Sequence, residues 1–403
     1  MGTGEAELKG RGDAPVSGSA LAGWKAEAVH RPGLPHCPST SNLFSWLSSI
    51  LLMAEMKVTA TALNSTSSPP QGPATTNSEV VTYTAPWPVY ALGFPYHHSP
   101  ALRLAIGSFI ESRNNRLEVL ELAEASHHFQ VLDSFEHTYP ASKLMWLPDT
   151  TGAKPELLAS SSDCLRVFRF QQGGSKPVAQ LVNRKNVKYS SPLTSFDWNA
   201  DNSALLGTAS IDTTCTIWDL EKETITTQLI AHDKEVYDIA FSKGIHSFAS
   251  VGADGSVRLF DLRSLQHSTI LYESCNFTPL LRLAWNKMDE NYLATIMMDS
   301  HTVTILDVRA PAIPIAELLG HRGAVNALTW APHSCCHICT AGDDCMTLIW
   351  DLQRPAHSMQ GTSQADPILT YTAEAEISTL QWSAAASEWV AIAFNRSIQA
   401  LRT

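Results

Sequence analysis

The sequence predicts an all-β fold: a seven-bladed β-propeller preceded by an N-terminal extension. Three observations predict it. A repeat of about 45 residues runs from Trp87 to the end of the chain, each repeat alternates apolar and polar residues as strands do, and no long amphipathic helical pattern follows residue 79. Residues 87–403 number 317, which seven such units fill. A fixed period of roughly 40–45 residues with four strands per unit is typical of propeller blades.

Each repeat has the same internal order. A strand ending in Trp or Phe is followed by a strand of small residues, such as 206–210, and then by a strand that ends in an apolar residue and Asp. Small residues in the second strand allow neighbouring blades to pack closely. The apolar residue of the closing pair is Trp218, Phe260, Leu306 or Trp350, at intervals of 42, 46 and 44 residues.

The last repeat supplies only three strands, at 377–382, 389–394 and 397–402. A three-stranded blade would leave the ring open and expose a sheet edge. The segment 80–84, VVTYT, is rich in β-branched residues and has no partner of its own. We therefore expect residues 80–84 to close blade seven, so that 79–403 form the propeller.

Residues 1–78 have a different composition, rich in Ser, Thr, Ala, Pro and Gly. Such a segment cannot bury enough apolar surface to offset the entropy of ordering, so we expect a disordered or low-complexity extension. Its apolar island at 43–53 is too short to span a bilayer; a targeting segment or a partner-binding helix are the alternatives. Met53 and Met56 leave open whether residues 1–52 belong to the mature protein.

Charge and cysteine content exclude several classes of protein. The 28 basic and 39 acidic residues give a net charge of −11, which argues against direct binding to nucleic acid or to anionic membranes. Eight irregularly spaced Cys residues suit a reducing compartment and not a disulfide scaffold. No uninterrupted apolar run reaches the length of about 18 residues that a spanning helix needs.

Over about 320 of the 403 residues the repeats resemble those of WD-repeat β-propellers. The resemblance implies a structural tetrad that pins a turn by buried hydrogen bonds. Its aspartates recur six residues before the Trp or Phe, which indicates architecture and not chemistry. The matching residues are His321, Thr340, Asp344 and Trp350 in blade six; His232, Ser250 and Asp254 in blade four, where Phe260 replaces Trp; and Thr208, Asp212 and Trp218 in blade three, which lacks the His.

Signatures of catalysis are missing from the sequence. It has no nucleophile elbow, no GxGxxG after a strand, no Walker loop and no HExxH. The His, Ser and Asp of blade four have the composition of a hydrolytic triad, but the same residues fit the structural tetrad. We expect a protein that is not an enzyme and needs no cofactor.

A cluster of zinc-ligand residue types occurs in blade six: Cys335, Cys336, His337, Cys339 and Cys345. Tetrahedral zinc needs four converging side chains. Alternation along a strand sends neighbouring side chains to opposite faces, so these residues are not expected to converge. We expect ordinary buried thiols, with metal binding and redox chemistry as the alternatives.

Propeller ends are rigid platforms of loops, so partner contacts are expected there. On the tetrad side the candidate residues are Asp233, Lys234, Glu235 and Arg322. A second candidate is the basic cluster of Arg184, Lys185 and Lys188, in the link between blades two and three. This cluster either docks an acidic peptide or is simply a solvated loop.

Two tetrapeptides, 260–263 (FDLR) and 306–309 (LDVR), match in part the Trp-Asp-x-Arg motif by which many WD-repeat proteins dock to the adaptor of cullin-4 ubiquitin ligases. Both lack the Trp. The resemblance makes Arg263 and Arg309 candidate docking residues; the alternative is an arginine that is merely solvated.

Longer stretches, among them 85–91, 143–149, 192–199 and 228–241, resemble one subfamily. It includes the plant transparent-testa-glabra, anthocyanin-regulator and light-regulated WD proteins and the animal cullin-4-associated factor that holds dual-specificity kinases. The resemblance implies a scaffold in nucleus and cytoplasm that assembles basic helix-loop-helix and MYB-type transcription factors or kinases, in developmental, pigment or circadian-type regulation. A substrate receptor of a cullin-4 ligase is the alternative function.

Overall fold

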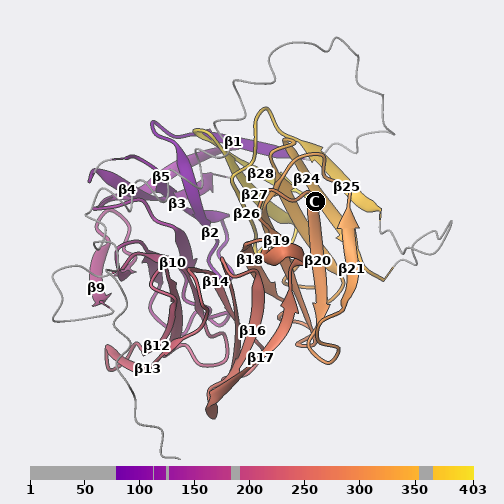
Figure 1. The fold of residues 1–403 in the computed structure, drawn as a ribbon. Helices are drawn as coiled ribbons and strands as arrows, with labels where there is room; N and C mark the ends of the chain where they lie inside the picture. The colour runs from indigo at the N-terminus through magenta and orange to yellow at the C-terminus, as the bar shows by residue number, and fades with distance from the viewer. Residues whose placement is uncertain (1–78, 112, 124–126, 183–190, 354–365) are drawn as a thin grey trace, which may run out of the picture. The chain divides into compact units, whose positions relative to one another are not determined.

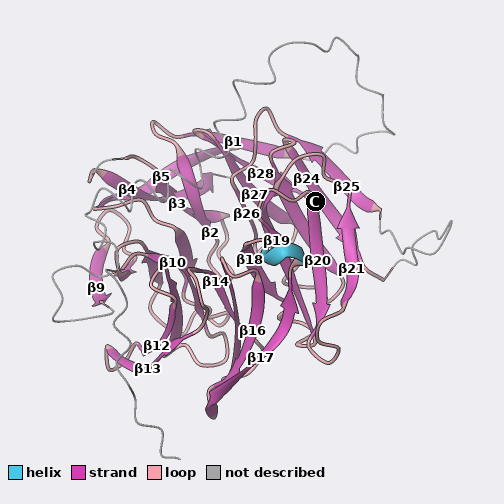
Figure 2. Cartoon of the chain, in the orientation of Figure 1, coloured by secondary structure: helices cyan, strands magenta, loops and turns pink. Residues whose placement is uncertain are grey.

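The structure is a computed structural model that describes residues 79–111, 113–123, 127–182, 191–353 and 366–403. These residues form seven four-stranded antiparallel sheets (Figure 1). The one helix among them is the short 3-10 turn η1 (Cys275–Phe277), cyan in Figure 2. The predicted all-β, seven-bladed propeller is confirmed.

The first three blades follow the chain in order. Blade one consists of β2 (Val89–Gly93), β3 (Arg103–Ser108), β4 (Asn115–Ala123) and β5 (His128–His137). Blade two consists of β6 (Lys143–Trp146), β7 (Leu157–Ser161), β8 (Leu165–Arg169) and β9 (Lys176–Leu181). Blade three consists of β10 (Leu193–Trp198), β11 (Leu205–Ser210), β12 (Thr214–Asp219) and β13 (Thr224–Ile230).

The next three blades repeat this arrangement. Blade four consists of β14 (Val236–Phe241), β15 (Ser247–Gly252), β16 (Ser256–Asp261) and β17 (Ser264–Glu273). Blade five consists of β18 (Leu280–Trp285), β19 (Tyr292–Met297), β20 (Thr302–Asp307) and β21 (Pro314–Leu319). Blade six consists of β22 (Val325–Trp330), β23 (His337–Gly342), β24 (Met346–Asp351) and β25 (Pro367–Thr372).

Blade seven is built from both ends of the described chain. Its strands are β26 (Thr379–Trp382), β27 (Trp389–Phe394), β28 (Ser397–Arg402) and β1 (Val80–Thr84). Strand β1 pairs with β28 from Val80 opposite Leu401 to Thr84 opposite Ser397, and the two strands lie side by side in Figure 1. Residues 80–84 therefore occupy the outer position of the last blade, where the sequence analysis put them.

The first strand of each blade contacts the first strand of the next, from β2 round to β26 and back to β2, so the ring is closed. Apolar side chains fill the space between blades. Gly207 in β11 shows how tightly: a Cβ there would lie 2.9 Å from Ile239 and 3.2 Å from Phe241 of blade four. This close approach explains the small residues of the second strand. The described residues contain no helix suited in length and apolarity to crossing a bilayer.

Candidate functional site: the two ends of the ring

Because the strands of each blade are antiparallel, their connections fall at two ends. We call one end the tetrad face: it holds the links between blades and the turns between second and third strands. The opposite face holds the turns between first and second strands and between third and fourth strands. The candidate residues divide between these two faces.

Blade six contains the complete tetrad. His321 Nδ1 lies 3.0 Å from both carboxylate oxygens of Asp344, and its Nε2 lies 2.8 Å from Thr340 Oγ1. Trp350 donates its indole N–H to the same Thr340 oxygen at 2.9 Å. A carboxylate only accepts, so Nδ1 carries a proton; in the neutral ring Nε2 then accepts from the Thr340 hydroxyl.

This network links the tetrad face to the middle of the sheet. Asp344 also accepts from the backbone N–H of Arg322 at 2.8 Å and of Met346 at 3.1 Å. Burial acts to raise the pKa of Asp344, but the hydrogen bonds from His321 and Arg322 outweigh it and hold the pKa below its usual value. The carboxylate therefore stays ionised and pins the link between blades five and six to the turn after β23.

The Gly-His pair in blade six has a steric cause. A Cβ on Gly320 would lie 2.6 Å from the Trp350 ring, so the indole can reach Thr340 only because residue 320 is glycine. In blade four the smaller Phe260 occupies the Trp position, and Ala231 precedes the His within the same apolar cluster. The alanine is accommodated there because a phenyl ring is shorter than an indole.

Blade four has the same histidine contacts without the indole. His232 Nδ1 lies 2.9 Å from Asp254, and Nε2 lies 2.8 Å from Ser250 Oγ. Phe260 stacks instead on Phe248, with centroids 4.9 Å apart. The order Asp, His, Ser is that of a hydrolytic triad, but Ser250 and His232 have no exposed surface. No substrate carbonyl can reach the hydroxyl, so the arrangement is structural.

Blade three retains only the Thr–Trp contact. Trp218 donates to Thr208 Oγ1 at 2.9 Å. Asp212 accepts from Thr214 Oγ1 at 2.6 Å and so stabilises its own turn. No histidine reaches this network within the described residues.

Blade two contains a partial tetrad, with Glu136-His137 where blade six has Gly320-His321. His137 is buried and donates from Nδ1 to the Tyr139 carbonyl. Its Nε2 lies 2.9 Å from Ser160 Oγ. Burial lowers its pKa to about 4. Ser160 occupies the place of Thr340 and Phe168 that of the Trp. The sequence indicates this tetrad only by a histidine at 137, the position that His321 has in the Gly-His pair of blade six.

The candidate partner-binding residues on the tetrad face lie beside the tetrads. Asp233 is 82% exposed and pairs with Arg258 Nη2 at 2.7 Å. Lys234 and Arg322 are exposed, and Glu235 is half-buried. These side chains are therefore available at the surface of the tetrad face. The other basic candidates, Arg184, Lys185 and Lys188, lie outside the described residues.

Arg263 and Arg309 lie on the opposite face, after the third strands of the adjacent blades four and five. Arg263 is 66% exposed and binds Asp261 through Nε at 2.9 Å and Nη2 at 2.6 Å. Arg309 is 59% exposed and binds Asp307 in the same way, at 2.9 and 2.7 Å. Its guanidinium also lies over the Tyr292 ring, 5.8 Å from the centroid. Both arginines are thus exposed to solvent and each is held by the carboxylate two residues before it.

Charged residues of the innermost strands meet across the ring. Arg282 in β18 donates to the Tyr90 hydroxyl of β2 at 3.0 Å, although 192 residues separate them. Asp238 in β14 accepts from Ser195 Oγ at 2.6 Å and lies 3.8 Å from Lys143 Nζ. Sequence analysis missed these contacts; their only signal is a polar residue within an apolar first strand. The Arg282 contact joins blades five and one across the ring, whereas the Asp238 contacts join blade four to blades three and two.

The cysteine cluster of blade six does not form one group. Cys339 is fully buried and Cys345 lies in the turn on the tetrad face, but Cys335 is exposed and Cys336 half-buried. The expectation of buried thiols holds for Cys339 and is wrong for Cys335, Cys336 and the half-buried Cys345. The alternation argument applies within β23, whereas Cys335 and Cys336 precede the strand and Cys345 follows it.

Comparison with known proteins agrees with this architecture. The family profile described as "WD domain, G-beta repeat" matches residues 183–219, 223–261 and 312–351. The DDB1- and CUL4-associated factor 7 homolog of Dictyostelium discoideum is 51% identical over 324 residues, which cover 80% of this chain and 98% of that protein. The chain belongs to the WD-repeat family that this relative represents.

Fungal relatives of this WD-repeat protein extend the comparison. An uncharacterized WD repeat-containing protein of Schizosaccharomyces pombe is 35% identical over 391 residues, covering 80% of this chain and 90% of the relative. A WD repeat-containing protein of Saccharomyces cerevisiae is 36% identical over 338 residues, covering 72% and 63%.

Proposed function

We propose that this WD-repeat protein is a non-catalytic scaffold that docks to the adaptor of a cullin-4 ubiquitin ligase through Arg263 and Arg309. The observation that carries the proposal is the repeated geometry of these two arginines. They occupy the same position in adjacent blades, at the same end of the sheets, and each is held by the Asp two residues before it. The Dictyostelium relative is named for association with DDB1 and CUL4.

The clamped arginine suits protein docking for a physical reason. The Asp carboxylate takes the Nε and Nη2 edge of the guanidinium and fixes the side chain, so less rotamer entropy is lost on binding. No described residue is hydrogen-bonded to Nη1, so this edge of the guanidinium can bind a carboxylate or carbonyl of the partner. Loss of Arg263 or Arg309 should therefore weaken binding without disturbing the buried blade core.

The tetrad face is the proposed site for client proteins. It lies at the other end of the same sheets, so one molecule can hold the adaptor and a client together. The backbone N–H groups of Asp233 and Arg322 donate to the tetrad carboxylates, so the buried tetrads fix the loops that carry these exposed charges. The clients we propose are basic helix-loop-helix and MYB-type transcription factors or dual-specificity kinases, in nucleus and cytoplasm.

The test is affinity purification of the tagged full-length protein, with adaptor and clients quantified by mass spectrometry. The double variant Arg263→Ala/Arg309→Ala should lose the adaptor and keep the clients. Lys222→Ala is the matched control, because Lys222 follows the third strand of blade three, is 75% exposed and pairs with Asp219. It should keep both.

Two results would contradict parts of the proposal. Retention of the adaptor by the double variant would exclude these arginines as the docking site. Recovery of clients but no adaptor with the wild-type chain would leave a scaffold that acts without the ligase.

A further inference from the structure

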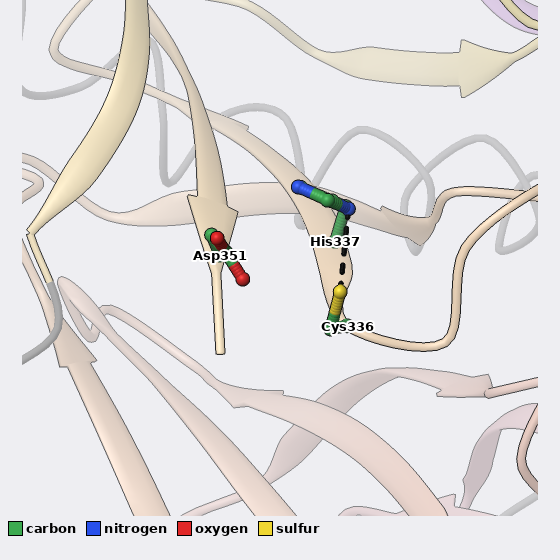
Figure 3. A group of neighbouring side chains, drawn as sticks. All are labelled: Cys336, His337 and Asp351. Atoms are coloured by element: carbon green, nitrogen blue, oxygen red, sulfur yellow. Dashed lines mark hydrogen bonds between the residues drawn. The ribbon is translucent and has the colours of Figure 1, made fainter. Parts of the chain in front are cut away.

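Three side chains with metal-ligating atoms meet on the opposite face of blade six (Figure 3). Cys336 immediately precedes β23, His337 begins it and Asp351 ends β24. His337 and Asp351 are direct cross-strand partners, and the Cys336 sulfur is turned toward the His337 ring. The ligating atoms of all three lie within 4.8 Å of one another.

The closest pair has the spacing of two ligands on one ion. Cys336 Sγ lies 3.4 Å from His337 Nδ1. With Zn–S and Zn–N bonds of about 2.3 and 2.0 Å, tetrahedral geometry sets the S···N separation at roughly 3.5 Å. Ser334 Oγ lies 3.2 Å from the same sulfur and 2.7 Å from the same nitrogen. This hydroxyl hydrogen-bonds both side chains and so holds the sulfur and the nitrogen close together.

We propose that Cys336, His337 and Asp351 bind one Zn²⁺ ion, with water completing the tetrahedron. On binding, the Cys336 thiol releases its proton to solvent water and the thiolate sulfur forms the Zn–S bond; neutral His337 and ionised Asp351 supply the other two bonds. The thiolate and the carboxylate together balance the two positive charges of the ion. A sulfur and an imidazole ligand select zinc over calcium and magnesium, which take oxygen ligands.

The surroundings hold the ligands in place. Asp351 Oδ1 accepts from the backbone N–H of Gln353 at 2.9 Å, which orients the carboxylate. Asn286 of blade five donates to the Cys335 carbonyl at 2.8 Å and so fixes the loop that carries Cys336. All three ligands are half-buried, so an ion can enter from solvent.

The test uses reduced, chelator-treated full-length protein titrated with Co²⁺ and then with Zn²⁺. Cobalt bound to a thiolate gives a near-ultraviolet charge-transfer band, and zinc should displace it. The wild type should show the band at one equivalent. Cys336→Ser should abolish the band. Asp351→Asn should weaken cobalt binding by more than about ten-fold, because it removes a ligand, and losing a residue that merely hydrogen-bonds a ligand already costs about ten-fold.

Cys335→Ser is the matched control, since Cys335 is the exposed neighbouring thiol outside the group. It should keep the band and the affinity of the wild type. Thermal unfolding of each variant without metal confirms that the fold is intact. No band in the wild type, or a band that survives in Cys336→Ser or is lost equally in Cys335→Ser, would overturn the proposal.

Discussion

Thr340 joins the two halves of the blade-six tetrad, and its replacement by valine is the sharpest test of that network. Valine keeps the shape of the side chain and removes the hydroxyl. Two buried groups then lose their partner: the Trp350 indole N–H and His321 Nε2. Thr208 in blade three provides the matched site, because its hydroxyl accepts from the Trp218 indole and, in place of a histidine, donates to the Thr216 carbonyl at 3.3 Å.

The magnitudes follow from the number of groups left without a partner. An unsatisfied buried polar group costs about 1–3 kcal/mol. Thr340→Val should therefore lower the free energy of unfolding by about 2–6 kcal/mol, and Thr208→Val by about 1–3 kcal/mol. The difference between the two variants compares the histidine contact of blade six with the longer contact to the Thr216 carbonyl in blade three.

Urea unfolding followed by tryptophan fluorescence gives both values, provided that the dependence on denaturant is the same in each variant. Equal losses in Thr340→Val and Thr208→Val would show that His321 adds nothing to the stability of the blade. A wild-type midpoint for Thr340→Val would refute the structural role of the tetrad altogether.

Three further outcomes are expected from urea unfolding. Val81→Asp puts a charge on the buried side of β1 and should cost more than about 3 kcal/mol, whereas Val80→Asp, on its exposed side, should stay within about 0.5; similar losses would mean that β1 does not seal blade seven. His137 is kept neutral by burial, with its pKa lowered to about 4. The unfolded chain takes up this proton below about pH 6.5, so stability is complete above that pH and falls by about 2 kcal/mol at pH 5; His137→Gln should remove this part of the pH dependence, and an unchanged slope would exclude the residue. Gly320→Ala pushes the Trp350 ring from its hydrogen bond and should cost about 1–3 kcal/mol; a neutral result would mean that the ring has room to move.

Much of the fold was predictable because propeller blades are local units. The pairs such as Trp350-Asp351 mark the third strand directly, and the odd strand at 80–84 follows from counting strands in the last repeat. The blade-six tetrad was readable because its members keep fixed offsets. His137 was harder, since its partner on Nδ1 is a backbone carbonyl that leaves no mark in the sequence.

The amino-acid sequence by itself determined the strand order, the number of blades and the buried polar set of blade six. These depend on patterns within about 45 residues and on covalent order. Only the tertiary structure decided which distant side chains meet. Closing the ring brings Arg282 to Tyr90, and the register of β23 and β24 places Asp351 opposite His337. Such contacts depend on the positions of whole sheets and on rotamers, which no local pattern encodes.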